Sequence, residues 1–387
     1  MIERNITPSL LALVGKFPVL TITGPRQSGK TTLLKKLFSD LPYFSLENPD
    51  TYSRIASDPR ALFQTYGHRM ILDEVQRFPQ LLSYIQGIVD DDRESLFVLS
   101  GSHNMLMMEG VSQTLAGRTA IFYLHPLSYS ELRVHLPMDV SANYLCWQGG
   151  YPRIYDHDIP ATTFYQSYLA TYVERDVRQV KNIGNLDAFT RFIRICAGFI
   201  GQTINKSTLA SAAGIDRHTA DAWLSVLRTS HIVYTIQPYF RNFKKRLVKS
   251  PKLYFRDTGL ACTLLGINAP EQLLTYYQRG AIFENFIFNE VSKSFFNQGL
   301  TPPLFFWRDN AQHEIDLLLN VKGQLRPVEI KSGMTYRQDF FQQLDWFSKV
   351  ADVPLYKPTV VYGGEDSQSI KEAFLLSWRE TEKLGSE

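Results

Sequence analysis

Residues 17–32 read FPVLTITGPRQSGKTT and decide the fold of the first part of the chain. A short β-branched run at 17–23 is followed by a glycine-bearing turn and an apolar-periodic segment at 31–38, which predicts a strand, a loop and a helix. The loop has the complete pattern G-x-x-x-x-G-K-[ST], whose backbone N–H groups curl around phosphates at a helix N-terminus. The expected nucleotide-binding residues are Gly24, Pro25, Arg26, Gln27, Ser28, Gly29, Lys30, Thr31 and Thr32.

Two residues of this loop have specific expected roles. Lys30 should reach the β- and γ-phosphates of ATP, and Thr31 should bind Mg²⁺. A second buried strand at residues 70–72 delivers two acids at its C-terminal end. We expect Asp73 to bind Mg²⁺, directly or through water, and Glu74 to orient and polarise the attacking water.

A third strand, at residues 96–99, ends in the polar sequence SGSHN. A side chain there is expected to sense the γ-phosphate; Ser102 is the first choice, with Ser100 and Asn104 as alternatives. Strands that alternate with helical patterns predict a parallel α/β sheet, which we expect to end near residue 160, after the breaker at 149–152.

Two arginines are candidates for stabilising charge in the transition state of ATP hydrolysis. Arg118 lies in the segment LAGR, and Arg175 lies in YVERDV. For each, the alternative is an ordinary ion pair on the surface or between domains.

The composition excludes several classes of protein. The 387 residues are 44% hydrophobic, which is ample for several cores and rules out a disordered chain. A formal net charge of +3 gives no global field for nucleic acid or membrane. Three scattered cysteines, Cys146, Cys196 and Cys262, predict buried thiols in a reducing compartment. With no signal peptide or transmembrane run, we expect a soluble, cytoplasmic protein without membrane contact.

The middle of the chain, residues 161–235, has a helical pattern. Residues 207–213, a turn capped by Asp216, and 217–228 predict a helix-turn-helix, and the strand-like run at 232–236 suggests a wing. An acid-free basic run follows, and its candidate contacts to nucleic acid are Lys244, Lys245 and Arg246. The alternative is a solvated loop. Asp221 in the second helix does not favour reading of the major groove.

The last part of the chain carries a second group of charged residues. Strands at 314–319 and 327–331 give the form D-x(n)-E-x-K, in which Glu329 and Lys331 share one face of a strand. Asp316 and Glu329, with Glu284 from the helix at 281–296, are expected to bind Mg²⁺ or Mn²⁺, while Lys331 activates water. The alternative is a salt bridge between Glu329 and Lys331 in a domain that only binds a partner.

The motifs together resemble those of a widespread prokaryotic family of AAA+-type ATPases with a C-terminal domain of unknown function. The residues that carry the resemblance are 24–31, LDEVQ at 72–76, SGS at 100–102, LAGR at 115–118, YVERDV at 172–177, 249–260 and EIKSG at 329–333. The resemblance implies ATP binding, and resemblance to related ATPases implies that the helix-turn-helix is a winged-helix lid over the nucleotide domain. The helix and strands that carry Glu284, Asp316 and Glu329 resemble the PD-(D/E)xK nuclease core.

We therefore expect an α/β protein with three parts: an AAA+-like ATPase core at 1–160, a helical and winged-helix lid at 161–250, and a restriction-endonuclease-like domain at 251–387. The first hypothesis is an ATPase whose nucleotide state gates a nuclease-like domain acting on nucleic acid. The second is a nucleotide-driven switch whose inactive nuclease-fold domain binds a protein or DNA without cleaving it. The sequence leaves open whether the assembly is a monomer or a ring.

Overall fold

The computed structural model describes residues 2–102, 111, 114–172, 185–239, 250–321, 323–351, 353–370 and 372–386. The chain forms two compact units. The first consists of Met1–Leu127, Thr229–His231 and Phe296–Leu300, and the second of Ser128–Arg228, Ile232–Phe295 and Thr301–Glu387.

The first unit is built around five strands that are all parallel, in the order β2-β3-β4-β1-β5. Its elements are α1 (Thr7–Leu11), β1 (Val19–Thr23), α2 (Lys30–Leu37), β2 (Tyr43–Ser45), α3 (Pro49–Ser57), α4 (Pro59–Tyr66), β3 (Arg69–Asp73), η1 (Val75–Arg77), α5 (Leu81–Asp91), β4 (Leu96–Gly101) and β5 (Thr119–Tyr123). The predicted strand, loop and helix at the N-terminus and the parallel α/β sheet are confirmed.

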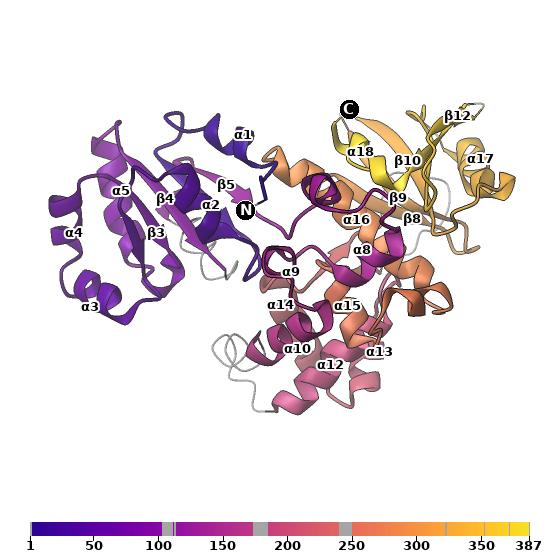
Figure 1. Ribbon diagram of the computed structural model, residues 1–387, viewed down its shortest axis with the longest axis horizontal. Coiled ribbons are helices and arrows are strands. Elements are labelled where there is room, and N and C mark those ends of the chain that lie inside the picture. The colour runs from indigo at the N-terminus through magenta and orange to yellow at the C-terminus, as the bar shows by residue number, and fades with distance from the viewer. Residues whose placement is uncertain are drawn as a thin grey trace. The chain divides into compact units, whose positions relative to one another are not determined.

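Helices cover both faces of this sheet, with α3, α4 and α5 on one side and α1 and α2 on the other (Figure 1). Strand β3 has apolar side chains on both faces of the sheet, because successive side chains of a strand point to opposite faces. Met70 and Leu72 pack with the α3–α5 side, and Ile71 packs with the α1–α2 side. A strand buried on both faces reads as a continuous apolar run, which is the pattern of a parallel sheet.

The second unit begins with helices and ends with a mixed sheet. Its helical part contains α7 (Tyr129–Leu132), η2 (Arg133–His135), α8 (Ala142–Gln148), α9 (Pro152–Asp156), α10 (Ala161–Tyr172), α12 (Leu186–Gly198), α13 (Lys206–Ala213), α14 (Arg217–Thr229), β6 (Val233–Ile236), β7 (Lys252–Phe255), α15 (Thr258–Leu264) and η4 (Pro270–Leu274). Its C-terminal part contains α16 (Arg279–Asn297), β8 (Leu304–Arg308), β9 (Glu314–Val321), β10 (Gln324–Lys331), η5 (Gln338–Phe341), α17 (Gln342–Val350), β11 (Thr359–Tyr362), β12 (Gln368–Ile370), β13 (Ala373–Ser377), η6 (Trp378–Glu380) and α18 (Lys383–Ser386).

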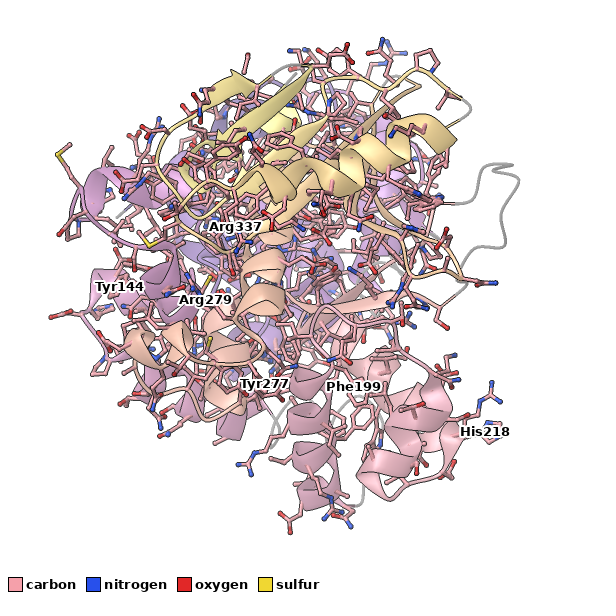
Figure 2. All side chains as sticks on the ribbon, turned by 90° about the vertical axis from the view of Figure 1, so that its right-hand side faces the viewer. Tyr144, Phe199, His218, Tyr277, Arg279 and Arg337 are labelled. Carbon is pink, nitrogen blue, oxygen red and sulfur yellow. The ribbon has the colours of Figure 1, made fainter. Side chains whose placement is uncertain are left out.

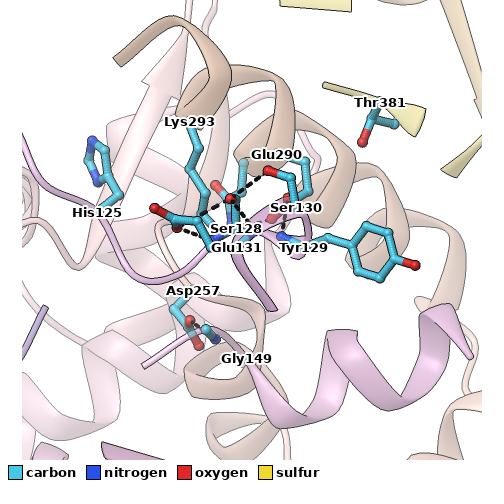
Figure 3. Close-up of polar contacts among 12 residues, drawn as sticks. His125, Ser128, Tyr129, Ser130, Glu131, Gly149, Asp257, Glu290, Lys293 and Thr381 are labelled. Atoms are coloured by element: carbon cyan, nitrogen blue, oxygen red, sulfur yellow. Dashed lines mark hydrogen bonds and ion pairs between the residues drawn. The ribbon is translucent and has the colours of Figure 1, made fainter. Parts of the chain in front are cut away.

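The first stretch of the compact unit that holds the phosphate loop ends at Leu127, and the domain boundary expected at residue 160 stays a prediction. The glycines at 149–150, where the sequence predicts a breaker, lie in a buried turn inside the second unit. Asp257 accepts a hydrogen bond from the Gly150 N–H at 2.8 Å, and a Cβ at Gly149 would lie 1.9 Å from the Tyr165 hydroxyl oxygen. Figure 3 shows Gly149 beside Asp257. Glycine is needed here for a close approach within one core.

The second unit starts with a capped turn. The Ser128 N–H donates to Glu131 Oε2 at 2.8 Å, and the Ser128 hydroxyl accepts from the Glu131 N–H, which is a capping box. The next amide, that of Tyr129, donates to Glu290 Oε2 at 2.7 Å, and Lys293 donates to Glu290 Oε1 at 2.8 Å (Figure 3). These bonds tie α7 to α16 within this unit.

The helix-turn-helix is confirmed as α13 and α14. Gly214 ends α13 in the left-handed conformation at φ 68°, and the Asp216 carboxylate accepts from the N–H groups of His218 and Thr219 at 2.8 and 2.9 Å. Strands β6 and β7 form an antiparallel pair after it, where a wing is expected. The assignment of these elements as a winged-helix lid stays a prediction, as does a boundary at residue 250.

The C-terminal sheet has six strands in the order β12-β13-β11-β10-β9-β8, of which β10, β11 and β13 run parallel. Strand β10 carries Val328 and Ile330 toward the core that contains α16. Leu325 packs in the core that contains α17. The strands predicted at 314–319 and 327–331 and the helix predicted at 281–296 are confirmed as β9, β10 and α16. The three cysteines are free and buried, as expected.

Candidate nucleotide site and C-terminal charged cluster

The loop between β1 and α2 is bent in a way that few residues allow. Gly24 has φ 149°, and a Cβ there would lie 2.2 Å from the carbonyl oxygen of Leu124. Gly29 has φ 93° and directly precedes α2, and Gln27 has a positive φ of 60°. Because the first N–H groups of a helix have no partner within the helix, this turn presents donors suited to an anion.

The ammonium group of Lys30 lies over the loop. Its side chain is 6% exposed and donates to the carbonyl oxygens of Gly24 and Pro25 at 2.9 and 2.8 Å. A lysine held at the mouth of a phosphate loop is a point charge in the place where an anion would bind.

Asp73 ends β3 and meets the first turn of α2. Its Oδ2 accepts a hydrogen bond from Thr31 Oγ1 at 2.7 Å and another from the Tyr43 hydroxyl at 2.6 Å. Ser100 donates to the other oxygen, Oδ1. The structure thus brings together Thr31 and Asp73, the two residues expected at Mg²⁺, and a hydroxyl and a carboxylate are oxygen ligands that this ion prefers.

Tyr43 was not predicted as part of this site. Burial, with the neighbouring Asp73 carboxylate, raises the pKa of the Tyr43 hydroxyl well above its usual value, so it stays a donor. No local signal marks Tyr43, because it reaches Asp73 only through the pairing of β2 with β3.

Glu74 follows Asp73 and adopts the left-handed conformation at φ 57°. Its Oε2 accepts hydrogen bonds from Ser102 Oγ at 3.1 Å and Gln76 Nε2 at 2.5 Å. The predicted sensor Ser102 therefore contacts the predicted base, whereas the alternative Ser100 contacts Asp73. Asn104, the other alternative, lies outside the described residues.

The two candidate arginines have different outcomes. Arg118 forms a two-bond ion pair with Asp90, at 2.6 and 2.9 Å, on the surface of the first unit. This ion pair is the alternative that the sequence leaves open for Arg118. The hydrogen bond from Arg118 lowers the pKa of Asp90. A role for Arg118 in catalysis stays a prediction. Arg175 lies outside the described residues.

In the C-terminal cluster, Asp316 lies close enough to Glu284 and Glu329 to repel both carboxylates. Lys331 Nζ donates to Glu329 Oε2 at 2.6 Å, and the Ile330 N–H donates to Asp316 Oδ2 at 2.8 Å. Glu329 is 1% exposed, and its Oε1 has no hydrogen-bond partner among the described residues. Burial, followed by repulsion from Asp316, raises the pKa of Glu329 to about 8. Although burial opposes it, Asp316 and Glu329 raise the pKa of Lys331.

Glu284 is held by a lysine that the sequence did not suggest. Lys252 Nζ, on β7, forms ion pairs with Glu284 Oε1 at 2.9 Å and with Glu314, and its side chain is 3% exposed. Tyr254 donates to Glu284 Oε1 at 2.5 Å. Burial raises the pKa of Glu284 to about 7, against the attraction of Lys252 and with further repulsion from Asp316.

The predicted metal set of Glu284, Asp316 and Glu329 is therefore assembled only in part. Throughout the chain that the structure describes, no three or more histidine, cysteine, aspartate or glutamate side chains group closely enough to hold a metal ion. Lysines hold two of the three carboxylates. The salt bridge between Glu329 and Lys331, the alternative from the sequence, is present.

The helix-turn-helix presents a polar outer surface. His218, at the start of α14, is exposed and projects outward (Figure 2). Asp221 of the same helix pairs with Lys206 of α13 at 2.6 Å. The basic candidates Lys244, Lys245 and Arg246 lie outside the described residues.

Three family models match consecutive parts of the chain. Residues 16–133 match an AAA domain. Residues 140–271 match a domain of unknown function (DUF8612), and residues 279–380 match another (DUF4143).

Relatives are found among curated proteins and solved structures. Uncharacterized proteins of Mycobacterium bovis and Mycobacterium tuberculosis are each 29% identical over 369 residues, covering 94% of this chain and 80% of theirs. A Walker-type ATPase of Pyrococcus abyssi has a TM-score of 0.47 and 14% identity, covering 68% of this chain and 96% of its own. A signal transduction ATPase with numerous domains from Pyrococcus horikoshii has a TM-score of 0.29 and 12% identity, covering 76% of this chain and 47% of its own.

The phosphate-loop motif, the parallel sheet and the family match make the N-terminal region a P-loop domain of the AAA type, a class that binds and hydrolyses ATP. Within the described residues, no helix is both long and apolar enough to cross a membrane.

Proposed function

We propose that the protein is a Mg²⁺-dependent ATPase whose site is the loop 24–32 together with Asp73 and Glu74. In this proposal Lys30 neutralises the β- and γ-phosphates, and Thr31 and Asp73 bind Mg²⁺, which neutralises charge on the phosphates. The observation that carries it is the hydrogen bond from Thr31 Oγ1 to Asp73 Oδ2 at 2.7 Å. It joins two motifs 42 residues apart in the sequence.

Glu74 is the proposed base that polarises the attacking water. Ser102 and Gln76 both donate to its Oε2, which leaves Oε1 to accept a hydrogen bond from water. In this arrangement, Ser102 and Gln76 fix the carboxylate orientation while Asp73 stays with Mg²⁺.

The test of this proposal separates binding from turnover. Glu74→Gln should keep ATP binding and lower phosphate release by at least about a hundredfold, because the water-polarising carboxylate is lost. Glu94→Gln, an exposed glutamate of the same unit, is the matched control and should hydrolyse ATP as the wild type does. Equal turnover in the Glu74→Gln variant and the wild type would reject Glu74 as the base.

We further propose that nucleotide state controls the C-terminal part of the chain, residues 251–387. The sequence leaves two roles open for this part of the chain: it acts on nucleic acid as a nuclease, or it binds a protein or DNA without cleavage. The charges of the cluster favour the second role. Lys252 and Lys331 already neutralise Glu284 and Glu329. A carboxylate paired with an ammonium group has little charge left for a divalent cation.

A different observation supports the first role, that of a nuclease. Glu329 Oε1 is buried without a hydrogen-bond partner among the described residues, and Asp316 raises the pKa of the same carboxyl group. A divalent cation between Asp316 and Glu329 would relieve both, with Lys331 beside it to act on water. The response of the cluster to divalent cations decides between cleavage of nucleic acid and binding without cleavage.

A further inference from the structure

Arg4 precedes the first helix and is 8% exposed. Its Nη1 donates to the carbonyl oxygen of Ser28 at 2.8 Å, and its Nη2 donates to the carbonyl oxygen of His125 at 2.6 Å. One planar guanidinium group therefore joins two backbone segments that are far apart in the sequence. Hydrogen bonds from a charged donor are stronger than those between neutral groups, and a fork of two fixes geometry as well.

The first of these segments is the phosphate loop. In a trans peptide the carbonyl oxygen and the following N–H point in opposite directions. By holding the Ser28 carbonyl, Arg4 thus fixes the direction of the Gly29 N–H, one of the donors expected to bind phosphate. Ser28 is fully buried, so this peptide has no water to replace Arg4.

The second segment directly follows β5 and leads out of the first unit, whose first stretch ends at Leu127. It contacts the loop at its other end as well. The Leu124 N–H donates to the carbonyl oxygen of Thr23 at 2.8 Å, and the Leu124 carbonyl lies so close to Gly24 that no Cβ fits. Residues 124–125 are therefore linked to both ends of the phosphate loop.

The His125 ring lies where the chain returns to the first unit. It packs against Phe296, with ring centroids 4.6 Å apart, and against His231, at 6.2 Å. These residues belong to 229–231 and 296–300, the two short segments that the rest of the chain contributes to this unit. The segments by which the chain leaves and re-enters the first unit thus meet at His125.

We propose that Arg4 is a positioning residue that holds the phosphate loop for ATP and transmits its occupancy to the junction formed by 124–127, 229–231 and 296–300. The inference rests on the proposed ATPase function and deepens it. When the loop closes on phosphates, the Ser28 carbonyl moves with it, and the guanidinium carries that movement to the His125 carbonyl. The junction is then the route by which nucleotide state reaches the second unit.

The experiment combines ATP affinity with amide hydrogen exchange in the full-length protein. In the wild type, a slowly hydrolysed ATP analogue should slow exchange in peptides covering 124–131. Arg4→Gln, which cannot hold both carbonyls, should weaken ATP binding about tenfold, raise KM with kcat changed less than about twofold, and remove the effect of nucleotide on 124–131. Arg4→Lys keeps the charge but not the fork, and should show the same loss more weakly.

A second variant tests the junction without touching the loop. Phe296→Leu should leave ATP affinity unchanged and reduce the nucleotide effect on exchange in 229–231. Arg54→Lys, an exposed arginine of the same unit, is the control and should match the wild type in both measurements.

The outcomes separate the two levels of the proposal. If the wild type does not bind ATP, the proposed function fails and the coupling with it. If the wild type hydrolyses ATP but exchange in 124–131 does not respond to nucleotide, only the coupling is overturned. An undiminished response in Arg4→Gln also overturns it.

Discussion

The nucleotide site and the C-terminal cluster both contain buried carboxylates, but their partners differ in charge. In the first, Asp73 is held by the neutral hydroxyl groups of Thr31, Tyr43 and Ser100. In the second, the ammonium groups of Lys252 and Lys331 hold Glu284 and Glu329.

A hydroxyl donor orients a carboxylate and leaves its negative charge in place, whereas a lysine cancels it. The residue types of a metal motif therefore do not suffice to identify a metal site. The charges that neutralise its carboxylates decide whether a cation is still needed.

The largest effect is expected at Asp73. Asp73→Asn keeps the size of the side chain but removes its charge, so Mg²⁺-dependent phosphate release should fall by at least about a hundredfold. The measurement is ATP turnover across a Mg²⁺ series. Asp50→Asn, on the exposed surface of α3, is the control. If the Asp73→Asn variant needs no more Mg²⁺ than the wild type and hydrolyses ATP as fast, Asp73 does not bind the metal ion.

The next effect concerns Lys252. Lys252→Met leaves Glu284 and Glu314 without their buried cation, so the free energy of unfolding should fall by about 3–5 kcal/mol in urea denaturation. The matched control is Lys206→Met, because Lys206 pairs with Asp221 while both side chains are 46% exposed. Removing that surface pair should cost about 0–1 kcal/mol. Similar losses in the two variants would show that Lys252 does not neutralise a buried cluster.

A smaller effect is expected from divalent cations. Because lysines already pair with Glu284 and Glu329, two of the three carboxylates, Mg²⁺ and Mn²⁺ without nucleotide should shift the melting temperature by no more than about 1 °C. Asp316→Ala tests the cluster, and Asp339→Ala, on an exposed aspartate, is its control. A stabilisation of several degrees that Asp316→Ala alone removes would favour the role of a nuclease. In that case, Lys331→Ala should stop cleavage of DNA and keep the metal-dependent shift.

The smallest effect concerns nucleic acid. If Lys244, Lys245 and Arg246 contact phosphates, DNA affinity should fall as salt rises, and replacing all three with alanine should make that slope shallower by up to about three. Replacing Arg217 and Arg228 of α14 should leave the slope unchanged, because the neighbouring Asp221 opposes phosphate binding. Filter binding across a salt series measures both. Equal slopes in the wild type and the triple variant would show that these three residues do not contact DNA phosphates.

Much of the first unit could be predicted because its signals are local. The strand at 19–23, the glycine turn and the acids after the strand at 70–72 are each read from fewer than about ten consecutive residues. The convergence of Asp73 on Thr31 follows from the parallel sheet, since the carboxyl ends of parallel strands meet at one edge.

The missed features all depend on contacts between distant segments. Lys252 reaches Glu284 across 32 residues, and Arg4 reaches His125 across 121. No periodicity or spacing announces such pairs. The packing of the glycine turn at 149–150 is another such feature, because the turn is held by Asp257, which lies more than a hundred residues further on.

The proposed ATPase depends on binding of ATP by the loop at 24–32 through Lys30. Its most direct test is calorimetric titration of the full-length protein with MgATP. We expect a single site in the wild type, an affinity at least about a hundredfold weaker in Lys30→Ala, and no change in Lys36→Ala, an exposed lysine of the same helix. Binding of MgATP by Lys30→Ala with the affinity of the wild type would contradict it.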